Sequence, residues 1–278
     1  MQSLLQVVQE AQGGGSKTEP LPELLPVLTA QGIVFEPGQM AMICARPNGG
    51  KSMLALWYAV KARIGCLYFS ADTDRRTTLY RAAAIKTSIE FDDIKNMLGT
   101  SAQDIVDEAI KEITQDGIQF EFAPNPSLDD LYREVDAYIE VYGKPPEMVV
   151  VDNLLNVAND AGDFQGLVQI MGDLHSMARE LDCALVVLHH VNTSTTKPEY
   201  PAPINSIRGQ VSQYPEIILA LAMLPEEGQM RVAMTKHRHR TPSPGGDTYE
   251  TIYVDPRRMT FYNSKAELQS AATAREWT

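Results

Sequence analysis

The sequence predicts an α/β fold: a mostly parallel sheet flanked by helices, with an antiparallel β-hairpin extension at its C-terminal end. Short apolar runs alternate with segments of helical periodicity along most of the chain, which is typical of βαβ units. These runs are apolar at nearly every position, as expected for strands covered on both faces. Beyond residue 217 the pattern alternates instead, which favours an antiparallel ribbon.

The order of the elements follows from the same patterns. Strands are expected over 40–44, 65–72, 118–122, 148–152 and 184–188, and helices over 51–60, 73–88, 102–114, 127–139 and 164–181. Ser127 is the expected N-cap of its helix. Residues 192–206 contain little that could pack, so we expect a mobile loop there. The ribbon is expected over 217–223, 230–235, 249–254 and 259–262.

Three segments are expected along the chain. They are an N-terminal helix and flexible linker over 1–34, a core over 35–263 and a tail over 264–278. The helical pattern in the first segment is too short to be stable alone and needs a surface to dock on, for instance on a neighbouring subunit. The alternative is a frayed tail.

Composition is ordinary for a soluble globular protein, with 44% hydrophobic and 22% charged residues in 278. No apolar run is long enough to span a bilayer, and the N-terminus does not resemble a signal peptide, so we expect a cytoplasmic protein that does not enter membranes. Cys44, Cys66 and Cys183 each lie in or beside an expected strand, which favours small buried side chains over disulfides or a zinc site. A net charge of −12 argues against a surface coated in basic residues for duplex DNA.

The most informative stretch joins the first strand to the first helix and reads ARPNGGKS over 45–52. A strand, a glycine-bearing loop, Lys-Ser and a helix form the P-loop arrangement, in which backbone N–H groups and the helix dipole hold nucleotide phosphates. Lys51 is expected at the β- and γ-phosphates, and the Ser52 hydroxyl on Mg²⁺. Ala45 stands where the motif has glycine. The expected ATP-binding residues are Ala45, Arg46, Pro47, Asn48, Gly49, Gly50, Lys51, Ser52 and Met53.

Two carboxylates follow expected strands, at the edge of the sheet where ligands bind. Asp152 is expected to hold Mg²⁺ together with Ser52, and the alternative is a cap of a turn. Asp72 is expected to act as the general base for the attacking water, and the alternative is an N-cap for the helix starting near Asp74. His189 and His190 follow another strand. One of them, His190 in our assignment, is expected to contact the γ-phosphate, whereas a metal site lacks a third ligand and a structural role stays open.

Cations gather after a strand near the C-terminus. Lys236, Arg238 and Arg240 alternate, so they are expected to point together. A γ-phosphate bound by an adjacent subunit would balance them, with Lys236 and Arg238 acting as a finger in trans. The alternative is a solvated basic edge or a patch for the DNA backbone. Arg208, Gly209 and Gln210, just after the expected loop, are candidates for tracking single-strand phosphates.

These motifs, in this order, resemble the RecA-like ATPase domain of replicative hexameric helicases of the DnaB type, including the small RepA-like branch. ARPNGGKS looks like the family's variant P-loop. Phe69–Asp72 falls where the family has Phe-Ser-Leu-Glu, with its catalytic acid, and Met148–Asp152 matches the Walker-B strand. His189-His190 resembles the RepA-like version of a strand that ends in Ser-Gln elsewhere, and Lys236–Arg238 resembles the Lys-x-Arg finger.

The resemblance covers about residues 35–263 and implies a hexameric ring with ATP at subunit interfaces and single-stranded DNA in a central channel. Arg208, Gly209 and Gln210 fall where the family's channel loop lies. Asp72 departs from the family's glutamate and has a shorter reach. The primase-interacting domain of the family has no counterpart before the expected core, so loading through it is not assumed.

The sequence therefore predicts an ATP hydrolase that acts as a ring-forming helicase or translocase on single-stranded or forked DNA, in the cytoplasm of a bacterial or phage-infected cell. Two alternatives remain open. One is a RecA-like repair or recombination ATPase, or a metal-dependent structure-specific nuclease that uses Asp72, Asp74, Asp152 and Asp160. The other is a nucleotide-gated ring that binds DNA without unwinding it.

Overall fold

The computed structural model describes residues 19–158, 164–195 and 197–275. The expected helix over 1–12, its linker and Asp160 lie outside these ranges. In the described chain one sheet has the strand order β3-β2-β4-β5-β1-β6-β7-β8-β9. The parallel strands are β1 (Met40–Ala45), β2 (Cys66–Ser70), β3 (Ile118–Glu121), β4 (Met148–Asp152), β5 (Ala184–His190) and β6 (Ile217–Leu224). The antiparallel strands are β7 (Gln229–His237), β8 (Glu250–Asp255) and β9 (Thr260–Tyr262).

The predicted fold class is confirmed: helices flank a mostly parallel sheet that ends in antiparallel strands. One strand differs from its prediction, because β6 pairs in parallel with β1 as well as antiparallel with β7. The strand expected over 184–188 also extends two residues further, so that His189 and His190 belong to β5 itself.

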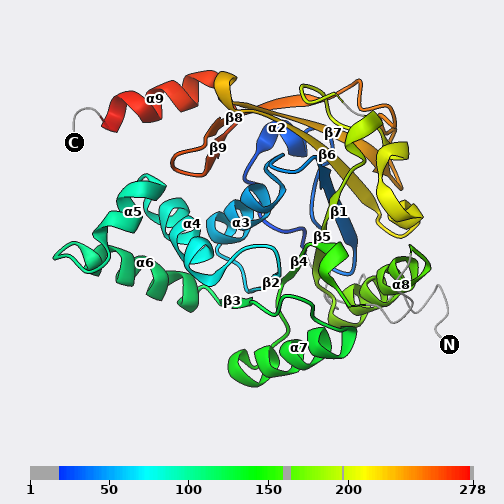
Figure 1. Cartoon of the computed structure of the whole chain (residues 1–278), viewed down its shortest axis with the longest axis horizontal. Helices are drawn as coiled ribbons and strands as arrows, with labels where there is room; N and C mark the ends of the chain where they lie inside the picture. Colours follow the sequence, from blue (N-terminus) through cyan, green and yellow to red (C-terminus); the bar gives the residue numbers. More distant parts are fainter. Residues whose placement is uncertain (1–18, 159–163, 196, 276–278) are drawn as a thin grey trace.

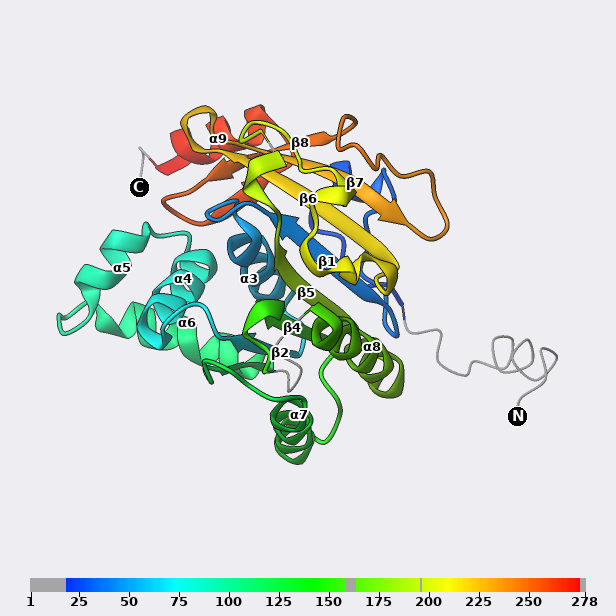
Figure 2. The same cartoon turned by 45° about the vertical axis from the view of Figure 1, so that its right-hand side comes forward.

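Helices cover both faces of the sheet. The elements are α2 (Pro26–Thr29), α3 (Lys51–Ala62), α4 (Arg75–Thr87), α5 (Phe91–Met97), α6 (Gln103–Gln115), α7 (Leu128–Tyr142), α8 (Phe164–Leu181) and α9 (Lys265–Arg275). Alternate side chains of β1 point to opposite faces. Ala41 and Ile43 join the core under α3, whereas Met40 and Met42 join the core under α7 and α8. Figures 1 and 2 show α4, α5 and α6 grouped together. The Phe91 N–H at the start of α5 donates to the Arg257 carbonyl in the turn after β8, at 2.8 Å.

Local sequence signals explain most of these boundaries. Ser127 caps α7 as predicted, with Asp130 completing a capping box, and Gly143 ends the helix in the left-handed conformation.

The pattern analysis did not predict α5 or α9. Part of the expected loop over 192–206 packs on the rest of the chain, because Ala202 and Ser206 are buried and Arg231 donates to the Glu199 carbonyl at 2.7 Å.

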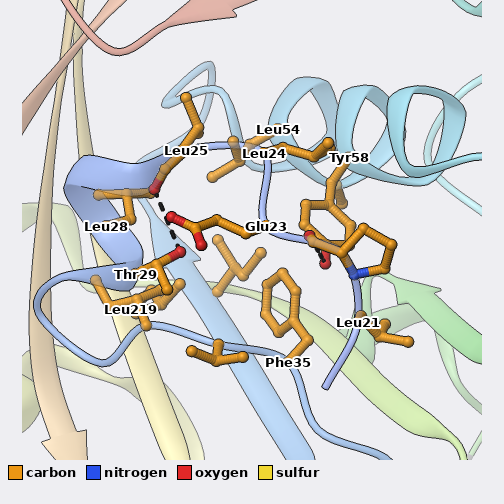
Figure 3. A pocket seen from close by; sticks show the side chains of 15 residues that line it. Leu21, Glu23, Leu24, Leu25, Leu28, Thr29, Phe35, Leu54, Tyr58 and Leu219 are labelled. Carbon is orange, nitrogen blue, oxygen red and sulfur yellow. Dashed lines mark hydrogen bonds between the residues drawn. The ribbon is translucent and has the colours of Figure 1, made fainter. Parts of the chain in front are cut away.

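The segment before residue 35 packs on the main core. Leu21, Leu25 and Leu28 are buried, and the Tyr58 hydroxyl of α3 donates to the Pro22 carbonyl at 2.8 Å. Figure 3 shows the apolar cavity of about 50 Å³ that remains between this segment and α3. The domain limits remain a prediction, but the packed hydrophobic core extends back to residue 21. No helix in the described ranges is long and apolar enough to cross a membrane.

Candidate nucleotide-binding site

The loop between β1 and α3 has the backbone that a P-loop needs. Gly50 is the N-cap of α3 and has a φ of 83°, and Asn48 has a φ of 60°. A Cβ on Gly49 would lie 2.6 Å from the Cβ of Ala45 and 2.9 Å from the Arg46 carbonyl oxygen. Glycine at 49 therefore makes room for the alanine that departs from the motif.

Lys51 occupies a buried position at the start of α3, with only 5% of its surface exposed. Its ammonium lies 3.2 Å from Nδ1 of His190. Burial lowers the pKa of Lys51, and the nearby carboxylates of Asp152 and Asp72 oppose that shift. The charge is thus held inside the protein by acids at the ends of two strands.

Asp152 ends β4 and is 3% exposed. Its carboxylate accepts a hydrogen bond from the Tyr68 hydroxyl at 3.0 Å and another from the Ser52 side chain. Burial raises the pKa of Asp152, while the hydrogen bonds from Ser52 and Tyr68 lower it. The structure therefore brings together the two residues predicted to hold Mg²⁺.

Asp72 lies beyond the end of β2 with 51% of its side chain exposed. Asn153 donates from Nδ2 to its carboxylate at 3.1 Å, and Nε2 of His190 lies 3.9 Å away. The Asn153 amide is itself fixed, because its Oδ1 accepts from the Leu155 N–H at 2.8 Å. Asp74, and not Asp72, caps α4. The Asp72 carboxylate is thus left available to a water molecule.

Two residues of this site escaped the sequence analysis. In the sequence, Tyr68 looks like one more apolar position of a buried strand, and Asn153 is only the residue that follows Asp152. A polar atom on a side chain that must be buried is the signal that could have identified Tyr68, since buried hydroxyl groups need a partner. The P-loop also contacts the chain after β5, because Arg46 donates to the Thr193 carbonyl at 3.1 Å.

The cations at the end of β7 and just beyond it do not all converge as predicted. The strand ends at His237. The Arg240 side chain occupies the space where a Cβ on Gly32 would be, apart from the other two. The expectation that all three point together is therefore wrong for Arg240. Arg238 pairs with Glu216 at 3.2 Å, and Lys236 donates to the carbonyls of Ser212 and Gln213 at 2.7 and 2.8 Å.

Glu216 is a buried carboxylate with several partners. It accepts from the Met40 N–H at 2.9 Å and from Nε2 of His175 at 3.0 Å, and it forms an ion pair with Arg238 at 3.2 Å. These partners keep the pKa of Glu216 below its ordinary value even though burial acts the other way. The carboxylate therefore holds the start of β1, α8 and the residue after β7 together.

The predicted DNA-binding residues lie in a short 3₁₀ segment, Arg208–Gln213. Gly209 has a φ of 81° there. The backbone of the segment follows the loop after β5, and Val211 anchors it in the core beside α8. Within the described ranges no cluster of three or more His, Cys, Asp or Glu side chains is arranged to hold a metal ion.

A model of the DnaB-like helicase C-terminal domain matches residues 28–240. The chain belongs to this family. As a DnaB-like helicase domain it binds nucleotide and is an ATP-hydrolysing enzyme of the replicative helicase type. The resemblance seen in the sequence is thereby confirmed.

Individual relatives agree with the family. The chain is 32% identical over 245 residues to the Gene 65 protein of Mycobacterium phage L5, covering 86% of this chain and 91% of that protein. Among solved structures, an ATPase domain has a TM-score of 0.77 at 20% identity, covering 94% and 97% of the two chains. A DnaB-like replicative helicase, described with its interactions with primase, has a TM-score of 0.75 at 20% identity, covering 94% and 66%. These two structures share the fold.

Proposed function

We propose that this DnaB-like protein works as a ring of identical copies, six in number, that moves along single-stranded or forked DNA. ATP and Mg²⁺ bind at the P-loop of one copy, and Arg238 of the next copy completes the site. The protein acts in the cytoplasm of a bacterial or phage-infected cell, which its phage relative supports.

One observation carries this proposal: Arg238 and the P-loop belong to opposite ends of the sheet. The Arg238 N–H bonds to the Glu216 carbonyl, and the Glu216 N–H bonds to the carbonyl of Met40, at the start of β1. The P-loop follows the other end of β1, after Ala45. Six residues of strand separate these ends by about 20 Å. The guanidinium is therefore remote from the phosphates of its own chain and suited to those of a second copy.

The residues of the P-loop fit ATP and Mg²⁺. Backbone N–H groups at the start of α3 and the buried ammonium of Lys51 suit the phosphates. The Ser52 hydroxyl and the Asp152 carboxylate adjoin each other and are oxygen donors of the kind Mg²⁺ prefers. A bound Mg²⁺ would neutralise charge on the β- and γ-phosphates.

We assign Asp72 as the general base that accepts the proton of the attacking water. Asn153 orients the carboxylate, and His190 stands between Asp72 and Lys51. His190 is close enough to respond to a γ-phosphate that draws Lys51 toward it. Arg238 of the neighbouring copy would stabilise the charge that develops on the transferred group.

Mixing two inactive variants tests the shared site. Lys51→Ala and Arg238→Ala should each abolish ATP turnover. When rings form from an equal mixture, roughly a quarter of the interfaces combine an intact P-loop with an intact arginine, so turnover should return. Failure to recover turnover, in mixed rings confirmed by size and mass, would show that Arg238 does not act on a neighbour.

A nucleotide-gated ring without unwinding is the second candidate. It is favoured by Asp72, which has a shorter side chain than the family's glutamate and is half exposed. Forked DNA with one labelled strand separates the two functions: a helicase releases the strand with ATP and Mg²⁺, and a gated ring only binds it. Cutting of the strand would instead support the nuclease hypothesis, although the described ranges contain no cluster of three or more His, Cys, Asp or Glu side chains arranged to hold a metal ion.

A further inference from the structure

The hairpin of β6 and β7 extends past the end of β1, beside the P-loop. Ala45, the last residue of β1, lies next to Leu221 of β6, and β6 continues to Leu224. β7 returns alongside it in the antiparallel sense, with Met230 directly opposite Met223. The two methionines therefore lie beside the loop that follows Ala45.

The ends of both methionine side chains meet Gly50 of the P-loop. A Cβ on Gly50 would lie 2.4 Å from the Cε of Met230 and 2.6 Å from the Cε of Met223. Met230 is fully buried, and Met223 is partly buried against the same core. The two methyl groups thus occupy the space in which a side chain at position 50 would begin.

The conformation of Gly50 sets the start of α3. Gly50 is the N-cap of this helix, with a φ of 83° and a ψ of 8°, and its carbonyl accepts the Leu54 N–H at 2.9 Å. Glycine adopts positive and negative φ about equally, so the residue itself does not fix this conformation. The N–H groups at the start of α3 take their directions from it, and these are the groups that a P-loop offers to phosphate.

Methionine has the properties that this contact needs. Its side chain is unbranched, flexible and polarizable, so two methyl groups can pack closely against one Cα. Its sulfur is only a weak hydrogen-bond acceptor, so neither side chain competes with a phosphate for the N–H groups of the loop. The neighbouring Gly49 is held by Ala45 of β1. Two glycines of the P-loop are therefore each packed against apolar groups of the sheet.

We propose that Met223 and Met230 are positioning residues of the nucleotide site, which keep Gly50 in its left-handed conformation in the nucleotide-free protein. This inference rests on the proposed binding of ATP at the P-loop and adds two residues that touch no part of the nucleotide. A loop that is already ordered loses less conformational entropy when phosphate binds, so the pair raises nucleotide affinity. The chemical step then depends on the pair much less than binding does.

Truncation of both side chains tests the pair. In Met223→Ala/Met230→Ala we expect the Kd for MgADP and the KM for ATP to rise about tenfold, while kcat at saturating ATP changes little. We also expect the Leu54 amide, which donates to the Gly50 carbonyl, to exchange its hydrogen about tenfold faster in the nucleotide-free protein. Met223→Leu/Met230→Leu keeps apolar groups of similar volume and should restore most of both effects.

Met177→Ala is the matched control, because Met177 is a fully buried methionine of α8 on the opposite face of the sheet. It should lower the melting temperature and leave MgADP binding, KM and exchange at Leu54 unchanged. Unchanged MgADP affinity in the folded double-alanine variant would overturn the proposal, and so would a fall in kcat without a rise in KM. If the wild-type protein binds no nucleotide, the proposed function fails, while exchange at Leu54 still decides whether the methionine pair holds Gly50.

Discussion

The ammonium of Lys51 lies 3.2 Å from Nδ1 of His190, whose Nε2 lies 3.9 Å from the Asp72 carboxylate. An ammonium only donates, so Nδ1 of His190 accepts and Nε2 carries the proton that faces Asp72. The histidine therefore lies between the lysine proposed to hold the phosphates and the carboxylate proposed as general base.

Replacing this histidine should affect the chemical step more than binding. We expect His190→Ala to lower kcat for ATP by roughly 10²-fold, with a smaller change in nucleotide affinity. His239→Ala, at an exposed histidine beyond β7, should leave both unchanged. An equal loss in affinity and kcat would instead assign His190 to ground-state binding.

The two acids after β2 should separate in their effects. Asp72→Asn should lower kcat by about 10²–10⁴-fold while MgATP still binds, because the amide cannot accept the proton of the attacking water. Asp74→Ala should lower thermal stability through the lost cap of α4 and leave kcat almost unchanged. Turnover and melting curves on the same preparations check both. Full turnover in Asp72→Asn would remove Asp72 from the chemistry.

The Tyr68 hydroxyl should set the acid limit of Mg²⁺-dependent nucleotide binding. Burial raises the pKa of Asp152, and the hydrogen bond from Tyr68 lowers it. Mg²⁺ needs the ionised carboxylate, so MgATP affinity is lost as the pH falls through the pKa of Asp152. In Tyr68→Phe this loss should begin about one pH unit higher, since a hydrogen bond to a charged group contributes roughly 1.5 kcal/mol. MgATP titrations between about pH 5 and 8 measure the shift, and identical midpoints would contradict it.

The fit of Ala45 against Gly49 can be tested by exchanging the methyl group. Gly49→Ala should destabilise the protein by about 1–3 kcal/mol, because its Cβ meets both the Ala45 methyl and the Arg46 carbonyl. Adding Ala45→Gly should recover part of this loss, while Ala45→Gly alone should be tolerated. Denaturant midpoints report all three, and simple additivity of the two changes would argue against direct contact.

Glu216 should make the stability of the protein depend on pH in the acidic range. The pKa of Glu216 in the folded protein lies below the ordinary value of 4.5. Its contribution to the free energy of unfolding is therefore complete above pH 4.5 and is lost as the pH falls through the pKa of the folded state. Glu216→Gln should therefore be less stable at neutral pH and show a smaller further loss between about pH 5 and 3. Thermal melting across this range provides the check. Parallel pH profiles would mean that other carboxylates dominate.

The site was predictable where chemistry depends on neighbours in sequence. The P-loop follows from a strand, a turn and a helix that are contiguous in the chain, and Asp152 follows from the acid that ends an apolar strand. The nucleotide end of the molecule could therefore be assembled from local patterns, whereas the room that Gly49 gives to Ala45 became visible only in the structure.

Contacts between distant segments could not be predicted in this way. Nothing near Lys236 in the sequence indicates Ser212 and Gln213 as its acceptors, and nothing near Arg238 indicates Glu216. The alternation rule failed at Arg240 because the strand ends at His237. Tyr68 was missed for a related reason, since its partner Asp152 lies on a neighbouring strand. Short helices such as α5, whose buried apolar residue is Ile94 alone, carry too little periodicity to be recognised.

The placement of Arg238 and the P-loop at opposite ends of one sheet gives each copy two unlike faces. Copies that join through these faces must all stand the same way round, head to tail. Any assembly built so has a front and a back, and a strand threaded through it meets every subunit in the same sense. Direction of travel would then be inherited from the shape of a single chain.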